Sequence, residues 1–510
     1  MVDLTRVPVL IGGGQFTNRS PGGDDGPGAW DMLRIAAGEA AADAGDKGLL
    51  RRLSDIWLVS SLTLQGEPDA AGRLRDELGA VNARAVNGGA GGAVPQWLAG
   101  RAAEEVLRGR RPLVLIAGCE ALATKRLRDR AGALDNLRSN MSDSAARGQR
   151  AATAPTFPPI DADPGVHAVE LAHGLGLPTH MYALAESVVA HQAGDDVAAH
   201  RARMGRIMER LNAVAADNPY AWFPARRSAA ELATPSPSNR VVCHPFTKYL
   251  CAIMDVDMAA SVLMTDAQTA RDLGLATSDV AFVAGWADAK DIWYVSERPD
   301  LGRSPAINAC AGSALSMAGA SIDDVTAFDL YSAFPVAVEV TMGAIGLTES
   351  DPRPLTLTGG LPYHGGAGNN YVTHSLVNTL HRVRSGGADE TVLVHGNGYF
   401  LTKHAVGVYR GAPPVGATVT QDDLQRSVDA DAAPIPLSGT VEGRGHIVAY
   451  TVDYDRAGGP ADGIVVAEVR GSRTVAIASN ELRDALVSAD CVGQGVHVTP
   501  GAGRNTVAQV

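Results

Sequence analysis

The chain has 510 residues, of which 45% are hydrophobic and 20% charged, which is enough for the cores of two or three globular domains. The formal net charge of −12 disfavours nucleic acid or an anionic membrane surface as a partner. Five scattered cysteines argue against a disulfide framework, and no apolar run approaches the roughly 18–20 residues that span a bilayer. Because the start of the chain also lacks a charged-then-apolar leader, we expect a soluble cytoplasmic protein.

The first part of the chain alternates strands with helices. A short strand at residues 9–11 stops at three glycines, and a helix at about 30–44 ends at Gly45, a residue typical of a helix C-cap. Residues 113–117 form a continuous apolar strand, which is typical of a sheet buried on both faces. The alternation predicts an α/β unit with a mostly parallel sheet.

The pattern changes between about residues 121 and 244. Proline-rich loops alternate there with helical stretches at about 182–192 and 197–215, which predicts a helical insertion within an N-terminal half of residues 1–244. Residues 245–410 return to the α/β alternation and predict a second half, with a strand at 280–284 and helices at 306–318 and near 336–345.

The last part of the chain has a different pattern. Gly411-Ala412-Pro413-Pro414 predicts a boundary, so residues 411–510 form an additional domain. Short β-like segments with glycines between them predict a small OB-like barrel. These segments are residues 446–452, 464–467, 474–477 and 496–498. Interleaved basic and aromatic positions are lacking, so a protein or an acyl-CoA is a better expected partner than single-stranded nucleic acid.

The tetrapeptide Gly-Gly-Ala-Gly occurs twice, at residues 88–91 and 365–368. Each copy precedes a helix-like stretch, a glycine and an apolar strand, and further segments upstream match in the same order. The repeat predicts an α/β unit used twice, with a glycine-rich turn at the same helix N-terminus. Such a turn offers backbone N–H groups to an anion or a polarised thioester oxygen, but glycine also permits close helix packing, and both explanations stay open.

These motifs resemble the thiolase superfamily over nearly all of residues 8–410. The likeness rests on Val86-Asn87 before a glycine-rich helix start, Ala117-Gly118-Cys119-Glu120 at a strand end, Asn218-Pro219 in the insertion, and a turn at Gly396-Asn397-Gly398-Tyr399. Pro245-Phe246-Thr247-Lys248 with Met254-Asp255-Val256-Asp257 is similar to the branch related to sterol-carrier-protein thiolases. The resemblance implies the thiolase fold, with duplicated βαβαβαββ halves in five layers and an inserted helical loop domain.

The resemblance also locates four catalytic positions. The nucleophilic cysteine position is occupied by Ala90, and the acid/base cysteine position by Gly396. Tyr331 falls where the family holds a catalytic water, and His364 is the one candidate for the histidine that faces the thioester. A methyl group cannot attack a thioester, so we expect neither two-cysteine thiolysis nor Claisen condensation.

Binding residues follow from the same resemblance. It implies that the thioester oxygen lies near the Gly91 and Gly92 amides, with polar contacts from Ser332 and Asn397. In the family the insertion clamps the nucleotide of coenzyme A, so phosphate contacts are expected from basic residues there: Arg126, Arg128, Arg226 and Arg227. Each assignment has a structural alternative, namely packing for Tyr331, a polar turn for His364 and a solvated surface for the arginines.

No metal site is expected, because Cys243, His244 and Cys251 lack a recognised ligand spacing. No tightly bound cofactor is expected either, and the expected ligand is a coenzyme A thioester. Thiolases usually form dimers through an edge strand, here near residues 83–86, so we expect a homodimer or a partner enzyme bound through the C-terminal domain.

Three hypotheses describe the function. The first is an acyl-CoA-binding protein of the acetyl-CoA acetyltransferase class in lipid metabolism, with non-covalent chemistry in which His364 or Tyr331 is the base. The second is a non-catalytic acyl-CoA-binding subunit or scaffold for a partner enzyme. The third is a thiolase with a relocated cysteine, for which Cys119 is a poor candidate because free cysteine is usually buried.

Overall fold

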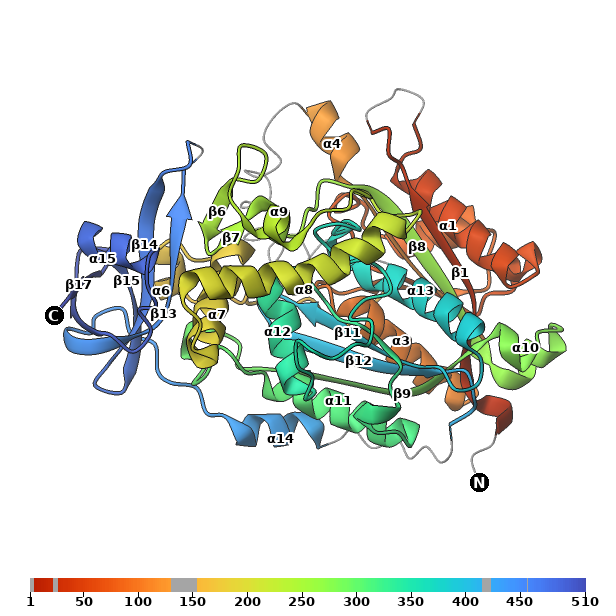
Figure 1. Ribbon diagram of the computed structural model, residues 1–510. Helices are drawn as coiled ribbons and strands as arrows, with labels where there is room; N and C mark the ends of the chain where they lie inside the picture. The colour runs from red at the N-terminus through yellow and green to blue at the C-terminus, as the bar shows by residue number, and fades with distance from the viewer. Residues whose placement is uncertain (1–3, 22–25, 130–153, 415–422, 456) are drawn as a thin grey trace.

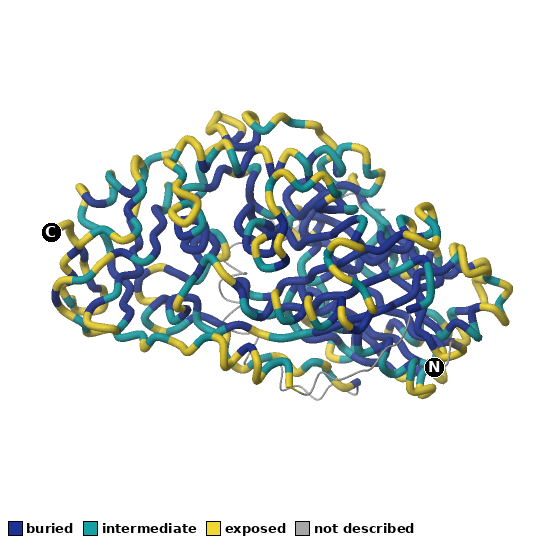
Figure 2. The backbone as a smooth tube through the Cα atoms, turned by 60° about the horizontal axis from the view of Figure 1, so that its bottom comes forward, coloured by how far each residue is buried: buried dark blue, intermediate teal, exposed yellow. Residues whose placement is uncertain are grey.

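The computed structural model describes residues 4–21, 26–129, 154–414, 423–455 and 457–510. Strands and helices alternate along most of this chain, and the buried residues concentrate in the sheets and in the helices between them (Figures 1 and 2). Within these residues, no helix combines the length and the apolar character needed to cross a membrane.

One ten-stranded sheet contains both predicted halves. First-half strands appear across it in the order β3 (Arg84–Gly88), β2 (Asp55–Leu58), β4 (Leu113–Ala121), β8 (Asp257–Asp266), β1 (Pro8–Thr17). Second-half strands continue from β1 in the order β9 (Ala281–Lys290), β12 (Lys403–Arg410), β11 (Thr391–Gly398), β10 (Ala327–Asp329). The halves join where Val9 and Leu10 of β1 pair with Phe282 and Ala281 of β9.

The two halves repeat the same arrangement. In each half, the last strand in chain order pairs antiparallel both with the strand before it and with the first strand. Parallel pairs, such as β2 with β4 and β10 with β11, lie on the side remote from the first strand. The position of β3 is taken in the second half by an extended segment, since Phe328 N donates to Pro354 O and Leu330 N to Leu355 O. The predicted duplication is therefore present in the backbone.

Helices form three layers around the two halves. α3 (Val94–Leu107) and α13 (Tyr371–Gly386), which follow the two glycine-rich turns, pack against each other and against strands of both halves. α1 (Ala29–Asp43) covers the outer face of the first half, and α11 (Pro305–Ala318) covers that of the second. With α12 (Pro335–Ala344) and α2 (Ala70–Glu77), these helices give the expected five layers (Figure 1).

The repeat divides at a different place from the predicted boundary at 244/245. β8 lies between β4 and β1, and is therefore the fifth strand of the first half. The second half begins at β9, after α10 (Ala267–Asp272). The sequence pattern could not place this division, because an apolar strand such as β8 carries no mark of the sheet neighbours that it will pair with.

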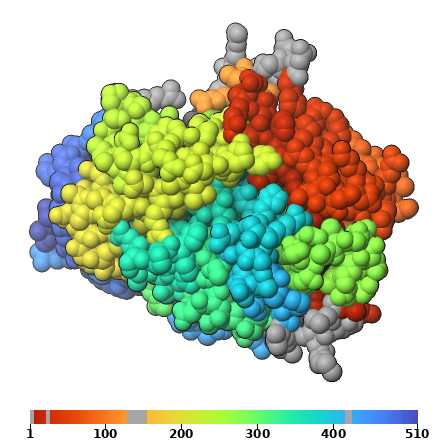
Figure 3. Space-filling view, turned by 45° about the vertical axis from the view of Figure 1, so that its right-hand side comes forward, coloured from red at the N-terminus to blue at the C-terminus, as the bar shows by residue number. Residues whose placement is uncertain are grey.

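The predicted insertion contains two long helices, α7 (Pro178–Ala193) and α8 (Val197–Asp217). α7 ends at Gly194 in the left-handed region, and Asp196 caps α8 by accepting a hydrogen bond from Ala199 N at 2.7 Å. In Figure 3 the insertion lies against the second half. Its smaller elements are α4 (Leu122–Asp129), β5 (Thr156–Phe157), α6 (Ala168–Ala172), α9 (Ala229–Ala233), β6 (Val241–His244) and β7 (Phe246–Thr247).

The C-terminal region forms a closed five-stranded β-barrel, as predicted. Its strands pair in the order β13 (Gly443–Tyr454), β14 (Pro460–Val469), β15 (Ser472–Ala478), β17 (Thr506–Gln509), β16 (Gly495–Thr499) and back to β13. α15 (Asn480–Leu486) packs on the barrel, whereas α14 (Leu424–Asp431) precedes it and packs on α11. β6 pairs with β13, so the barrel is attached to the insertion (Figure 1).

The outer edge of β3, the strand near which thiolase dimers would pair, carries a strand of the same chain. β5 runs parallel to it at Asn87 and Gly88, and Phe157 of β5 packs against Trp97, with ring centroids 4.8 Å apart. Part of the backbone that a second copy would need is therefore already paired.

We expect the protein to be a monomer in solution, because β5 occupies part of the pairing edge. Light scattering coupled to size exclusion should give a mass near 52.8 kDa across a range of loading concentrations. A concentration-independent mass of about twice that value would contradict this expectation.

Candidate functional site

The two glycine-rich turns meet in the centre of the molecule. Asn369, just after the second turn, accepts a hydrogen bond from Gly91 N of the first turn at 2.9 Å. The Asn369 amide donates to Ser60 O at 3.0 Å and to Ser60 Oγ at 2.9 Å, and Ser60 Oγ donates to Gly89 O at 2.7 Å. Asn369 thus fastens the second turn to the first turn and to the segment that follows β2.

The first turn requires glycine because other groups pack directly on its backbone. Gly91 has a φ of +119°, a value that favours glycine. A Cβ on Gly92 would lie 2.3 Å from the Tyr331 hydroxyl oxygen and 2.6 Å from Asn397 O. Close packing therefore explains these glycines. Of the two amides predicted to bind a thioester oxygen, Gly91 N–H is already bonded to Asn369, whereas Gly92 N–H has no partner among the described residues.

The positions that align with the two thiolase cysteines lie on adjoining backbone segments. Ala90 is half-buried in the first turn, four residues before α3 begins. Gly396 lies within strand β11 and not in a turn as predicted. It pairs with Ala405 of β12, and the chain turns only after Gly398. A Cβ on Gly396 would come within 3.0 Å of Ala93 Cα, so β11 leaves little room there for a side chain.

Tyr331 and Asn397 lie against the first turn. The Tyr331 hydroxyl contacts Gly92, and burial raises the pKa of this phenol far above its usual range. Asn397 donates to the Tyr182 hydroxyl at 2.7 Å, while its Oδ1 is buried with no hydrogen bond to any described residue. Ser332 is fully buried and accepts from Leu361 N at 3.3 Å, which gives it a structural role.

Sequence reasoning missed Tyr182, which lies on insertion helix α7. Its hydroxyl donates to Tyr399 O at 3.1 Å, and its ring stacks on Phe334 with centroids 4.6 Å apart. Burial raises the pKa of Tyr182 to about 12. No sequence signal marks this tyrosine, because its partner Asn397 is remote along the chain and the contact exists only in the folded protein.

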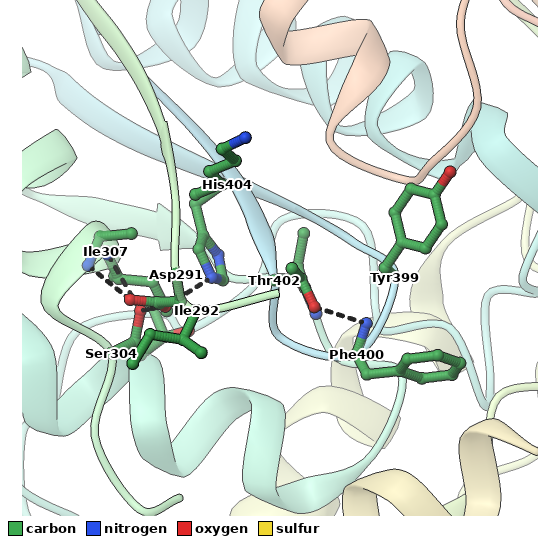
Figure 4. A network of polar contacts seen from close by, with 12 residues as sticks. Asp291, Ile292, Ser304, Ile307, Tyr399, Phe400, Thr402 and His404 are labelled. Atoms are coloured by element: carbon green, nitrogen blue, oxygen red, sulfur yellow. Dashed lines mark hydrogen bonds and ion pairs between the residues drawn. The ribbon is translucent and has the colours of Figure 1, made fainter. Parts of the chain in front are cut away.

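The loop after β11 places Tyr399 beside Gly91. Tyr399 has a positive φ of 58°, and Arg298, which is buried, donates to Phe400 O at 3.0 Å and to Thr402 Oγ1 at 2.9 Å. Figure 4 shows the neighbouring network, in which Asp291 contacts both Ser304 and His404. These buried bonds fix the loop, and with it the Tyr399 ring that covers the first turn.

His364 is fully buried between two aromatic rings. Its ring is 4.9 Å from that of His374 and 5.8 Å from that of Tyr371, centroid to centroid. Burial lowers the pKa of His364 to about 3, and a hydrogen bond with the Gly365 backbone opposes this shift only in part. His364 is therefore a neutral imidazole at neutral pH, in which one ring nitrogen can donate a hydrogen bond and the other can accept one.

His364 and Tyr331 both contact Tyr371, which follows the second glycine-rich turn. The Tyr331 ring is 5.9 Å from that of Tyr371, edge to face, and the Tyr371 hydroxyl accepts from Gly360 N at 3.0 Å. Behind His364, His374 Nδ1 bonds to Gln15 Oε1 at 2.7 Å. The structure therefore brings His364 and Tyr331 to one aromatic side chain, and the Tyr331 hydroxyl lies next to Gly92 of the first turn, close to Asn397 O.

Of the predicted phosphate-binding arginines, Arg126 and Arg226 are exposed and Arg227 is half-buried. Arg126 forms an ion pair with Asp255, and Arg226 contacts both carboxylate oxygens of Asp217, at 2.9 and 2.8 Å. The Arg227 guanidinium lies 4.3 Å from the centre of the Tyr249 ring. The Arg128 side chain lies outside the described part of the chain.

All five cysteines are free and buried. Burial raises the pKa of the Cys119, Cys243 and Cys310 thiols well above the usual value, and that of Cys251 to about 12. A reactive cysteine needs a lowered pKa and exposure, so the geometry gives no support to a relocated nucleophile.

We expect Asn369→Ala to lower the free energy of unfolding by about 1–3 kcal/mol, since it leaves Gly91 N–H and the Ser60 groups without their partner. Urea denaturation measures this change. Asn308→Ala is the matched control, because Asn308 is exposed and makes a single bond to Ala344 O; its effect should stay within about 0.5 kcal/mol. Equal effects of the two substitutions would contradict the bridging role.

We expect His364 to make the protein less stable in acid. Its folded pKa lies below that of an unfolded histidine, so the unfolded state binds the proton more readily and stability is lost as pH falls from about 6.5 towards 3. One such group contributes a slope of about 1.4 kcal/mol per pH unit. In urea denaturation between pH 4 and 7, His364→Gln should flatten the profile by that amount, whereas the exposed His497→Gln should not.

Comparisons with known proteins agree with this architecture. The family model of the "Thiolase-like protein type 1 additional C-terminal domain" matches residues 423–502. A monomeric SCP2-thiolase-like protein type 1 from Mycobacterium smegmatis is 30% identical over 100% of both chains, with a TM-score of 0.81. A comparison with curated protein sequences gave no match.

More distant structures share the thiolase core. An Ltp2–ChsH2(DUF35) aldolase is 17% identical over 80% of this chain and 99% of that one, with a TM-score of 0.59. An acetyl-CoA acetyltransferase from Syntrophomonas wolfei is 15% identical over 79% of this chain and 99% of that one, with a TM-score of 0.53. The chain has the thiolase fold and belongs to the SCP2-thiolase-like protein type 1 family.

Proposed function

We propose that this protein binds a coenzyme A thioester in its thiolase-type core without forming an acyl-enzyme. The proposal is carried by the close contact between the backbone of the turn that contains Ala90 and the backbone around Gly396, the two positions aligned with the thiolase cysteines. Ala90 offers no nucleophile, and a side chain on Gly396 would meet Ala93 Cα at 3.0 Å. The Gly92 amide, which is unpaired among the described residues, supports a thioester-binding role for the turn, whereas neither aligned position would supply the thiol that an acyl-enzyme requires.

The groups that remain suit non-covalent chemistry on the thioester. The Gly92 amide is a candidate hydrogen-bond donor to the carbonyl oxygen, and the neutral His364 imidazole is a candidate base for a proton next to that carbonyl. Tyr331 is the second candidate base, although its raised pKa makes it a better proton donor than acceptor. Proton abstraction or a retro-aldol cleavage would use these groups. One structure of this fold is described as an aldolase, which supports chemistry other than thiolysis.

The nucleotide end of coenzyme A is proposed to bind at the insertion. Arg126 and Arg226 would exchange their carboxylate partners for phosphate oxygens, and Arg227 lies next to Arg226 along the chain. His364 is fully buried, and Trp222 N donates to His364 O at 2.7 Å. The reacting end of the ligand would therefore displace the segment around Trp222 to reach the imidazole.

The second candidate is a non-catalytic subunit that carries an acyl-CoA for a partner enzyme in lipid metabolism. The complete burial of His364 favours it, since a buried base cannot meet a substrate without rearrangement. The C-terminal barrel is the proposed partner surface, and the related aldolase structure includes a DUF35 partner. A cytoplasmic location fits both candidates.

Calorimetry tests the binding proposal. Coenzyme A and a series of acyl-CoAs should bind the purified full chain, and Arg226→Ala should weaken binding because it removes a phosphate contact. Arg426→Ala is the matched control, since Arg426 is equally an exposed arginine in an ion pair, on α14. If neither coenzyme A nor any acyl-CoA binds, the proposal fails.

Product analysis by mass spectrometry then separates the two candidates. Turnover of a 3-hydroxyacyl-CoA that disappears in His364→Ala indicates catalysis, whereas binding with no turnover indicates a carrier. The Ala90→Cys/Gly396→Cys protein should show no thiolysis, because a Cβ at position 396 would crowd Ala93 Cα at 3.0 Å and shift the second cysteine. Thiolysis by that variant would show that only the residue types, and not the backbone, exclude the reaction.

A further inference from the structure

Three helices bring metal-ligating side chains together outside the site described above. Glu186 of α7, His200 of α8 and Glu339 of α12 have side chains that are 0%, 4% and 6% exposed. One ligand atom from each lies within 4.8 Å of the other two. These residues are far apart in the sequence, and the packing of the insertion on the second half creates the cluster.

The cluster carries an excess of negative charge. Arg203 Nε lies 3.1 Å from Glu339 Oε1 and 3.2 Å from Asp195 Oδ2. One guanidinium is therefore the ion-pair partner of Glu339 and Asp195, and Glu186 pairs with His200. Buried charge needs compensation, and a divalent cation would neutralise the remainder.

The buried carboxyl groups of the cluster lie against one another as well as against Arg203. Glu339 Oε1 and Asp195 Oδ2 each form an ion pair with Arg203, and the Glu339 carboxyl group also interacts with that of Glu186. Glu186 in addition accepts from Val336 N at 2.9 Å and contacts His200 Nε2 at 2.8 Å. Two buried carboxyl groups in contact need a shared proton or a cation between them, and a metal ion would take the place of that proton.

The ligand types and their surroundings suit a transition metal. One imidazole nitrogen with carboxylate oxygens is a ligand set found for zinc and related divalent ions. His200 presents Nε2 to the cluster, while its Nδ1 lies 3.2 Å from Arg203 Nη2 and 3.6 Å from Asp195 Oδ2. Metal binding at Nε2 would place the ring proton on Nδ1, which would then donate to Asp195 instead of accepting from Arg203.

We propose that Glu186, His200 and Glu339 form a structural site for a divalent transition-metal ion, with Asp195 positioning His200. The cation replaces the direct contact between Glu186 and His200 and draws α7, α8 and α12 together. Tyr182 precedes Glu186 by one helical turn, and Val336 N binds Glu186, so the site holds the insertion behind Phe334 and Tyr331. This proposal does not depend on coenzyme A binding.

Zinc is the probe for the test. Full-length protein is freed of metal with a chelator, incubated with Zn²⁺ and passed through gel filtration. Elemental analysis should find about one zinc per chain, and the melting temperature should rise by several degrees. Glu339→Gln and His200→Gln should lose both effects, and Asp195→Asn should weaken binding about 10- to 100-fold. Glu349→Gln removes the exposed ion pair between Glu349 and Arg206 of α8. This variant is the matched control and should behave as wild type.

Two further measurements keep the test decisive if a variant folds poorly. Wild-type protein loaded with Co²⁺ should give the visible absorption of a low-symmetry protein site, and Zn²⁺ should abolish it. Metal-free Glu339→Gln should melt no lower than metal-free wild type, because it removes a buried charge. The proposal is overturned if wild type retains no zinc, which would mean that the carboxyl groups share a proton, or if Glu339→Gln binds zinc as tightly as wild type.

Discussion

The contact between the two glycine-rich turns is the constraint on which the centre of this molecule depends. Asn369 holds Gly91 N and Ser60 in one small network, so the duplicated halves are joined at the point where α3 and α13 begin. Backbone packs on backbone there, since Gly396 faces Ala93 and Gly398 faces Gly91 with no side chain between them. Any larger residue would separate the turns, which is why this region is built from glycine and alanine.

This close packing engages backbone groups of the core. The Gly91 amide is bonded to Asn369, and a Cβ on Gly396 would lie 3.0 Å from Ala93 Cα, so both positions take part in the packing of the turns. The polar groups around Tyr371 remain, and their burial keeps His364 neutral. The insertion supplies Tyr182 to this region, and the barrel is attached to the same insertion through β6 and β13. The added domain and the centre are thus connected through one set of helices.

Much of the fold could be predicted from local pattern. The repeated Gly-Gly-Ala-Gly, the helices α7 and α8 and the short strands of the barrel each have a clear periodicity or turn signal. Prediction was less successful where the role of a segment depends on which strands lie beside it in the fold. Gly396 lies in a strand because it pairs with Ala405, and β8 completes the first half because it lies between β4 and β1. Strand pairing between distant segments leaves no local mark.

The sequence by itself determined the duplicated α/β architecture, and the resemblance predicted, through Ala90 and Gly396, that cysteine is absent from the two catalytic positions. The tertiary structure alone decided that Asn369 occupies the Gly91 amide, that His364 is buried, and that Glu186, His200 and Glu339 meet. The physical reason is that residue type follows from the sequence directly, whereas hydrogen-bond partners, pKa values and ligand sets depend on distances and burial that exist only after folding.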